Sequence, residues 1–357
     1  MPLYTHERNY GCRVQDELVY RGLRLLVLEN ELIRITVLLD KGADIYEFVY
    51  KPRDVDFLWR SPLGLRPPMV SHDTRPATHG PFSDYYEGGW QECLPNGGRT
   101  CTYKGVELGQ HGEVWGIPWR HQVLEDSPEC VSVKLGCRTP RSPYLLERTM
   151  TLRSGIPVVQ IDEAVTNESS ETLDLMWGHH PAYGPPFLDE SCVLDCAAQT
   201  VVVDKNVGTE SQLPAGARFA WPVGKTRDGR EWDVSRVTPP EQRVTEMTYL
   251  TDLQEGWYAL TNQSKRVGVG MAFDTNVFRH LWCWQNLAGE TGWPFWGRCY
   301  VMAVEPFSSI PAILTKAIEA GTQLTIESGQ TLKTWIRAVA YEGRERVSGI
   351  APDGTLR

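Results

Sequence analysis

Short hydrophobic runs that end at turn residues restrict the fold of this chain more than any other feature. Within a run, apolar residues alternate with polar ones or follow one another without a break, and both patterns are typical of β-strands. Neighbouring runs are commonly about eight to twelve residues apart, the spacing of an antiparallel sandwich. Clear runs lie at residues 23–28, 32–38, 130–136, 145–152, 158–165, 266–273, 299–304 and 331–341. We therefore predict an all-β protein built as a large antiparallel β-sandwich.

The length of 357 residues is compatible with one domain, because all-β sandwiches can run long as a single unit. The 32 glycines and 24 prolines are spread along the chain and mark no linker. We expect a single domain over residues 1–357 that folds alone or as a simple oligomer such as a homodimer.

Composition and charge exclude several classes of partner. A formal net charge of −9 opposes binding to nucleic acid, which requires a dense basic surface. No run approaches the roughly eighteen apolar residues of a membrane span, and the N-terminus lacks the apolar segment of a secretory signal. The nine cysteines form no Cys-x-x-Cys pair, and we expect them to be reduced thiols. We expect a cytoplasmic protein that acts on a small molecule.

Two aromatic-rich segments interrupt the strand pattern and are the expected site loops. Residues 61–98 contain six prolines and the run Asp-Tyr-Tyr-Glu-Gly-Gly-Trp at 84–90. Loops of this length inside a compact domain are usually functional. Residues 282–298 combine Trp282, Trp284, Trp293, Phe295 and Trp296 with Gln285, Asn286 and Glu290. Aromatic faces suit the C–H faces of a sugar while amides bond its hydroxyls; packing in a large core explains the same tryptophans equally well.

Three short motifs carry the ionisable side chains: Gln-His-Gly-Glu-Val-Trp at 110–115, Trp-Gly-His-His-Pro-Ala-Tyr at 177–183 and Met-Ala-Val-Glu-Pro at 302–306. In order and separation they resemble the two histidine motifs and the glutamate strand of the aldose 1-epimerases (galactose mutarotases), particularly a divergent branch of that family. Residues 39–45 and 56–59 are similar to the opening hairpin of the family. The resemblance covers roughly residues 20–342 and implies the same sandwich fold.

The resemblance implies a sugar mutarotase that interconverts anomers by opening the ring. Glu305 would remove the proton of the anomeric hydroxyl, His180 would protonate the ring oxygen, and His111 would bond the same oxygen region. One base and one acid suffice for this reaction, so we expect no cofactor and no metal. We expect the glutamate to titrate near its usual pKa and the histidine near pKa 6.5.

The sugar itself is less constrained, because this chain lacks the usual Asn-Arg motif before the first histidine and the substrate-binding aspartate of the family. We expect a monosaccharide or a simple derivative of one. The predicted binding residues are Trp282, Trp284, Trp296, Arg75, Arg99, Asp84, Gln285, Asn286 and His179. If an arginine lines the pocket, an anionic group on the sugar becomes plausible, because arginine binds such groups in bidentate fashion.

Several alternatives stay open at this point. His179 competes with His180, because adjacent residues in a strand point to opposite faces and only one can face the site. His111, His179, His180 and Glu305 could in principle form a metal site, which the divergence of the two histidines disfavours. A carbohydrate-binding module without activity, or another sugar isomerase or lyase with the same acid and base, would share the fold.

Overall fold

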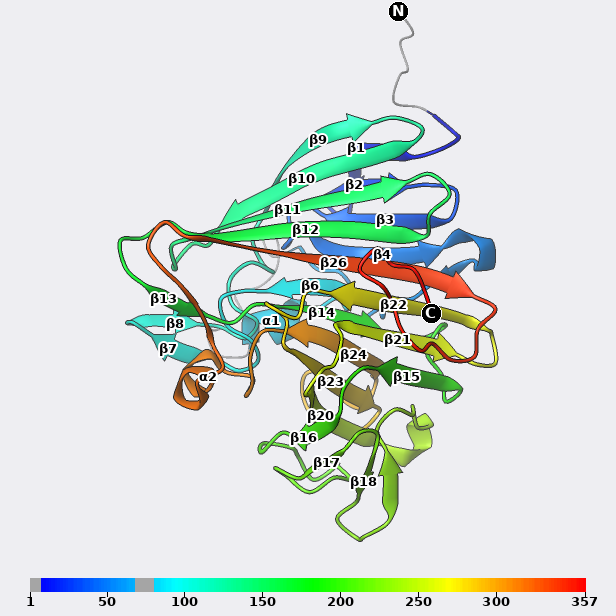
Figure 1. The fold of residues 1–357 in the computed structure, drawn as a ribbon, viewed down its shortest axis with the longest axis vertical. Helices are drawn as coiled ribbons and strands as arrows, with labels where there is room; N and C mark the ends of the chain where they lie inside the picture. Colours follow the sequence, from blue (N-terminus) through cyan, green and yellow to red (C-terminus); the bar gives the residue numbers. More distant parts are fainter. Residues whose placement is uncertain (1–7, 68–79) are drawn as a thin grey trace, which may run out of the picture.

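Two large antiparallel sheets pack face to face in the computed structural model, which describes residues 8–67 and 80–357 (Figure 1). The twelve-stranded sheet has the order β1 (Arg13–Tyr20), β2 (Leu23–Glu29), β3 (Ile33–Leu38), β4 (Asp44–Tyr50), β6 (Trp90–Cys93), β14 (Gly178–Tyr183), β24 (Tyr300–Phe307), β23 (His280–Leu287), β20 (Val244–Thr251), β16 (Thr200–Val203) and β17 (Arg218–Ala220), with β5 (Val55–Asp56) paired to β4. The eight-stranded sheet has the order β15 (Cys192–Cys196), β21 (Trp257–Asn262), β22 (Val267–Phe273), β26 (Thr331–Glu342), β12 (Val158–Asn167), β11 (Tyr144–Arg153), β10 (Cys130–Arg138) and β9 (Arg120–Asp126).

Small elements complete the described structure. The two-stranded ribbons are β7 (Cys101–Tyr103) with β8 (Val106–Leu108), β13 (Leu173–Leu175) with β25 (Leu324–Ile326), and β18 (Val223–Lys225) with β19 (Glu231–Asp233). The helices are α1 (Gly80–Tyr85), α2 (Leu314–Ala320) and the short 3₁₀ turns η1 (Lys51–Arg53) and η2 (Pro240–Gln242). In the part of the chain that the structure describes, no helix is long and apolar enough to cross a membrane.

The main hydrophobic core lies between the two sheets. Ile161 of β12 and Met302 and Val304 of β24 belong to this core, although they come from opposite sheets. Alternate residues of β24 point the other way: Val301 and Ala303 join a second cluster on the outer face of the twelve-stranded sheet. Because β24 is covered on both faces, its sequence reads as a continuous apolar run.

The prediction of an all-β antiparallel sandwich is confirmed, and each of the eight predicted strand runs overlaps an observed strand. The two expected loops are more ordered than predicted. Residues 61–98 contain α1 and β6, and residues 282–287, expected in a loop, belong to β23. β23 was missed because both its faces are buried, so that Trp282 and Trp284 alternate with Cys283 and Gln285 without a polar face to reveal the strand.

Candidate active site

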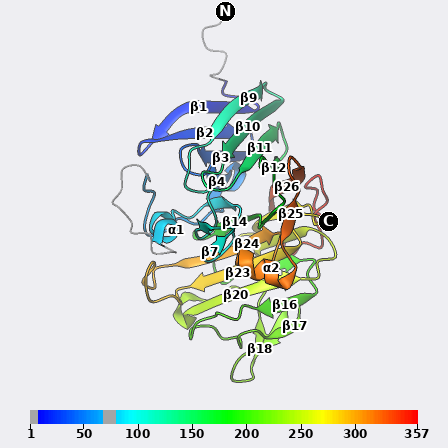
Figure 2. The same ribbon diagram turned by 90° about the vertical axis from the view of Figure 1, so that its left-hand side faces the viewer.

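A cleft with a volume of about 1190 Å³ lies on the outer face of the twelve-stranded sheet. Adjacent strands supply its floor, with His180 on β14, Glu305 on β24, Trp284 on β23 and Met247 on β20. Further walls come from α1, from the segment around His111 and from the segment after β23. In Figure 2, α1 lies to the left of β14 and β24, the strands that carry His180 and Glu305. The two predicted site segments therefore meet over one sheet face.

Strand alternation directs Glu305 and His180 into this cleft. On β24, Val304 packs in the core between the sheets, so the next residue, Glu305, points to the opposite face. On β14, His180 lines the cleft while His179 points into the sandwich and bonds Glu163 of the other sheet. Of the two adjacent histidines, His180 is therefore the one that faces the cleft.

His180 and Glu305 form a close and buried pair. Nε2 of His180 lies 3.9 Å from Oε1 of Glu305, and the side chains are only 6% and 2% exposed. Among the described residues, Oε2 of Glu305 has no hydrogen-bond partner. Burial raises the pKa of Glu305 well above its usual value and lowers the pKa of His180 to about 4. The expectation of ordinary pKa values is therefore wrong, because burial favours the neutral form of each group.

His111 reaches the same place from a loop. Its backbone is in the left-handed region, with φ 59°, and its backbone N–H donates to the carbonyl of Gly97 at 2.5 Å. The imidazole contacts that of His180 edge to face, with the ring centroids 4.9 Å apart. Burial, and then the neighbouring His180, lower the pKa of His111 well below 6.5. The sequence-predicted trio of His111, His180 and Glu305 is thus brought together in one cleft.

Aromatic side chains that the sequence did not single out enclose the two histidines. Phe82 of α1 lies edge to face with His111 at 4.3 Å and stacks on Tyr86 at 4.9 Å between ring centroids. The Tyr86 hydroxyl lies 3.4 Å from Nδ1 of His180. Both aromatic residues fall within the aromatic-rich segment 61–98, but composition alone could not show which of its rings reach the site.

Three of the predicted sugar-binding residues border the cleft. Trp284 is half-buried and lies 5.8 Å from His180 between ring centroids. Arg99 is exposed on the cleft wall. Trp282 is 1% exposed, because its indole stacks on Phe307 and donates from Nε1 to the carbonyl of Ser309. Trp282 therefore supports the floor and offers little surface to a ligand.

Gln285, Asn286 and Trp296, also predicted to bind the sugar, do not line the cleft. Gln285 points to the opposite face of β23 from Trp284, where its Nε2 donates to the carbonyl of Val234. The amide of Asn286 donates to Glu290, a residue of the cleft wall. Trp296 is 62% exposed and stands outside the cleft lining.

Asp84 links the two site segments instead of facing the cleft. Its carboxylate accepts a hydrogen bond from the indole of Trp293, 3.2 Å away, and Trp293 belongs to the cleft wall. Arg75, another predicted binding residue, lies outside the described residues.

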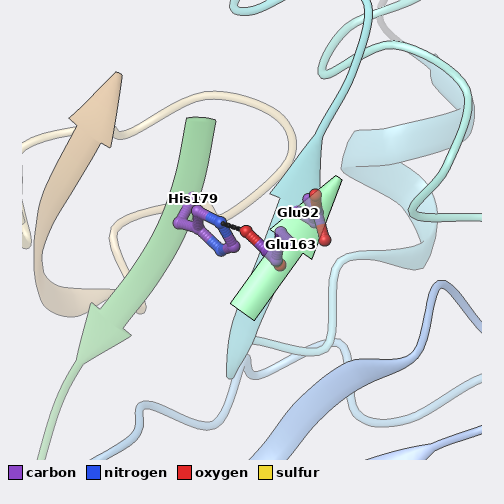
Figure 3. A group of neighbouring side chains, drawn as sticks. All are labelled: Glu92, Glu163 and His179. Atoms are coloured by element: carbon purple, nitrogen blue, oxygen red, sulfur yellow. Dashed lines mark hydrogen bonds and ion pairs between the residues drawn. The ribbon is translucent and has the colours of Figure 1, made fainter. Parts of the chain in front are cut away.

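His179 belongs to a buried polar network between the two sheets (Figure 3). Its Nδ1 accepts from the indole N–H of Trp90, so Nε2 carries the proton and donates to Glu163 at 2.9 Å. The guanidinium of Arg148 bonds both Glu163 and Glu92. Burial lowers the pKa of His179 to about 3, so the ring is neutral at neutral pH.

The carboxylates of Glu92 and Glu163 and the imidazole of His179 lie close enough together to suit a metal ion. Arg148 already supplies a positive charge to both carboxylates, and Nε2 of His179 is committed as a donor to Glu163. A ligand histidine must present an unprotonated nitrogen, and both nitrogens of His179 are engaged. We interpret this group as a structural ion-pair network that ties β6 and β14 to β11 and β12.

Comparison with known proteins agrees with the fold. Residues 20–338 match the model of a family described as a domain of unknown function (DUF4432). No curated protein matches the sequence significantly.

Solved structures share the architecture at low sequence identity. A candidate aldose 1-epimerase from Klebsiella pneumoniae aligns with a TM-score of 0.72 and 14% identity, over 92% of this chain and 83% of that one. A galactose mutarotase-like protein from Clostridium acetobutylicum aligns with a TM-score of 0.61 and 15% identity, over 93% and 99% of the two chains. A galactose mutarotase related enzyme from Lactobacillus acidophilus gives 0.58 and 15%, over 89% and 97%. At these identities the likeness establishes a galactose mutarotase-like fold.

Proposed function

The chain belongs to the DUF4432 family and has a galactose mutarotase-like fold, and from this premise we propose that it is a sugar mutarotase, an isomerase that interconverts the α and β anomers of an aldose. The reaction is acid and base catalysis through the open-chain sugar. Glu305 and His180 exchange the protons, and His111 assists beside them.

The buried pair of His180 and Glu305 is the observation that carries this proposal. A buried carboxyl group without a hydrogen bond to one of its oxygens is unfavourable for folding, so a structural role does not explain Glu305. Perturbed pKa values inside a cleft are typical of functional sites. A protein that only binds a sugar would have no need of such a pair.

His180 and Glu305 share one proton in addition to the N–H of the neutral imidazole. While they hold this proton, the pair contains both an acid and a base. With the proton on His180, Glu305 is a carboxylate and the imidazolium can donate; with the proton on Glu305, both groups are neutral. Burial keeps the neutral arrangement dominant in the free protein. The two arrangements differ in the position of one proton, and the 3.9 Å separation of Nε2 and Oε1 leaves a gap that a sugar oxygen can fill.

Each step of the proposed reaction balances within the pair and the sugar. Glu305 takes the proton of the anomeric hydroxyl and His180 gives its proton to the ring oxygen. The bond between C1 and the ring oxygen breaks, which leaves a ring-opened aldehyde. Rotation about the C1–C2 bond presents the other face of the aldehyde to the returning hydroxyl, and the reverse transfers close the ring and restore both groups.

The walls of the cleft support a sugar ring as the ligand. Phe82, Phe295 and Trp284 surround the reacting groups and suit the C–H faces of a pyranose. The exposed guanidinium of Arg99 on the same wall supports an anionic substituent, such as a carboxylate or phosphate. We propose a monosaccharide, or a simple acidic derivative of one, as the substrate.

Proton NMR of freshly dissolved α-anomers tests the proposal. The panel should contain neutral aldohexoses, their uronic acids and their 6-phosphates, each followed with and without protein. We expect the protein to accelerate the appearance of the β-anomer signal for at least one sugar. Binding of a sugar in saturation-transfer spectra without any acceleration would instead favour a carbohydrate-binding protein without activity.

A further inference from the structure

The hydroxyl of Tyr86 has one described hydrogen-bond partner, Nδ1 of His180 at 3.4 Å. Tyr86 is only 2% exposed, so its hydroxyl is largely shielded from solvent. Burial, with Glu305 and Glu87 nearby, raises the pKa of Tyr86 well above 10, so the phenol keeps its proton. A buried O–H donor must find an acceptor, because an unmade hydrogen bond is costly. The phenol therefore acts as the donor, and Nδ1 of His180 is the acceptor.

The ring of Tyr86 is fixed in place by other aromatic rings. Phe82 stacks on it with centroids 4.9 Å apart and planes at 27°. Trp59 packs against it at 5.6 Å and Phe295 at 6.4 Å. Because three neighbours restrict the ring, its hydroxyl has little freedom to leave His180.

The backbone around Tyr86 is anchored from the opposite side by a buried ion cluster. Glu87, the next residue, pairs with Nζ of Lys41 at 2.5 Å, and Lys41 also pairs with Asp44 at 3.0 Å. All three side chains are fully buried. The following Gly88 has φ 87°, and a Cβ there would lie 2.1 Å from the carbonyl oxygen of Trp59. The turn at 86–88 is thus clamped against β4 and the segment around Trp59.

We propose that Tyr86 is the positioning residue of His180: its hydroxyl donates to Nδ1 and so places the proton of the neutral imidazole on Nε2, the nitrogen that faces Glu305. The tautomer is inferred from the hydrogen bond and the burial of Tyr86; its consequence for catalysis rests on the proposed function.

The consequence for catalysis follows from the two ring nitrogens. The nitrogen that exchanges protons with the sugar must be Nε2, because Nδ1 is occupied by Tyr86. In the reactive arrangement both ring nitrogens carry protons, the Tyr86 hydroxyl accepts from Nδ1–H, and Nε2–H donates to the sugar. If the ring rotated, Nε2–H would leave the space beside Glu305. Tyr86 would therefore act on the rate of the proton transfers through His180, with little effect on how tightly the sugar binds.

Long-range ¹H–¹⁵N spectra of protein labelled with ¹⁵N-histidine read the tautomer directly and need no substrate. Comparison with His180→Asn assigns the His180 signals among the eight histidines. We expect His180 of the wild type to have a protonated Nε2 and an unprotonated Nδ1. Tyr86→Phe, which removes only the hydroxyl, should shift His180 toward the other tautomer or to a mixture.

A matched control is Tyr258→Phe, because Tyr258 is also fully buried and its hydroxyl bonds that of Tyr183 at 2.6 Å. Tyr258→Phe should leave the His180 signals unchanged. A wild-type spectrum with the proton on Nδ1 would overturn the proposal, and this reading does not depend on whether Tyr86→Phe folds. Unchanged His180 signals in a folded Tyr86→Phe protein would overturn it as well.

Activity provides the second measurement. On any sugar that wild type converts, Tyr86→Phe should lower kcat about 10–100-fold with little change in KM, the loss typical of removing a group that orients a catalytic histidine or ligand. If wild type converts no sugar, the proposed function fails while the tautomer result still decides the role of Tyr86. A normal kcat for Tyr86→Phe together with a shifted tautomer would show that the tautomer does not matter for turnover.

Discussion

Nε2 of His180 and Oε1 of Glu305 lie 3.9 Å apart, and burial shifts their pKa values in opposite directions. The lowered pKa of the histidine, about 4, lies below the raised pKa of the glutamate. Between these two values the pair holds one proton, as the proposed reaction requires. Below pH about 4 it gains a second proton, and above the pKa of Glu305 it loses the last one.

The pH dependence of kcat should follow this shared proton. We expect kcat to be level on the alkaline side of pH 5 and to fall as the pH rises through the raised pKa of Glu305, because the acid is then lost. Initial rates of anomerisation, corrected for the buffer-catalysed reaction, provide the measurement. A rate that keeps increasing with pH would show that the ionised glutamate alone limits turnover.

His179 should affect how the free energy of unfolding depends on pH, and it should not affect turnover. Its folded pKa is about 3 and its unfolded pKa about 6.5, so the unfolded chain binds the proton more readily and stability is lost as the pH falls from 6.5 toward 3. His179→Gln can keep both hydrogen bonds without titrating. The difference in unfolding free energy between pH 7 and pH 5 should shrink by about 2 kcal/mol in urea titrations of this variant.

The two neighbouring histidines offer a matched comparison for this second prediction. His180→Asn should lose most of the activity, and His179→Gln should keep it. Loss of activity in His179→Gln at unchanged stability would contradict the placement of His179 behind the sheet.

Arg148 should be essential for the packing of the two sheets. Arg148→Met would leave the carboxylates of Glu92 and Glu163 buried without their cation, at a cost of about 3–5 kcal/mol in unfolding free energy. Denaturant titration measures the loss. Because Arg148 supplies the positive charge that a metal ion would otherwise provide, a chelator should leave the thermal unfolding midpoint of wild type unchanged. A lowered midpoint would show that a metal ion is bound by Glu92, Glu163 and His179.

Arg99 should decide between neutral and acidic sugars. Arg99→Gln removes the charge and keeps a hydrogen-bonding side chain on the cleft wall. We expect it to raise KM for a uronic acid or sugar phosphate about tenfold or more, and to change KM for the matching neutral sugar little. Equal wild-type affinity for the neutral and acidic sugars would remove the basis for an anionic substrate.

Much of the fold was predictable because strand patterns are local. Apolar and polar residues alternate in the run at 331–341, and the observed strand β26 covers nearly the same residues. β23 was not recognised, because a strand buried on both faces loses the alternation that identifies it. The short motifs located His111, His180 and Glu305, since each is delivered by its own strand or turn.

Other parts of the site depend on tertiary contacts that no local pattern records. The side chains of His179 and His180 are equivalent in sequence, and only the position of the second sheet shows which one faces it. Tyr86 reaches His180 because a turn is clamped by the distant Lys41. The pKa values of the pair follow from burial, which is a property of the folded protein.

Glu305→Gln tests the central claim most directly. Glutamine keeps the shape of the side chain but cannot accept the anomeric proton, so kcat for a sugar that wild type converts should fall about 10²–10⁴-fold with KM little changed. Glu246→Gln is the matched control, because Glu246 is a buried carboxyl group of β20 that bonds Ser211 away from the cleft, and it should retain activity. Time courses of the α and β anomeric proton signals give both rates. Near-normal conversion by Glu305→Gln would show that the base lies elsewhere and would contradict the proposed mechanism.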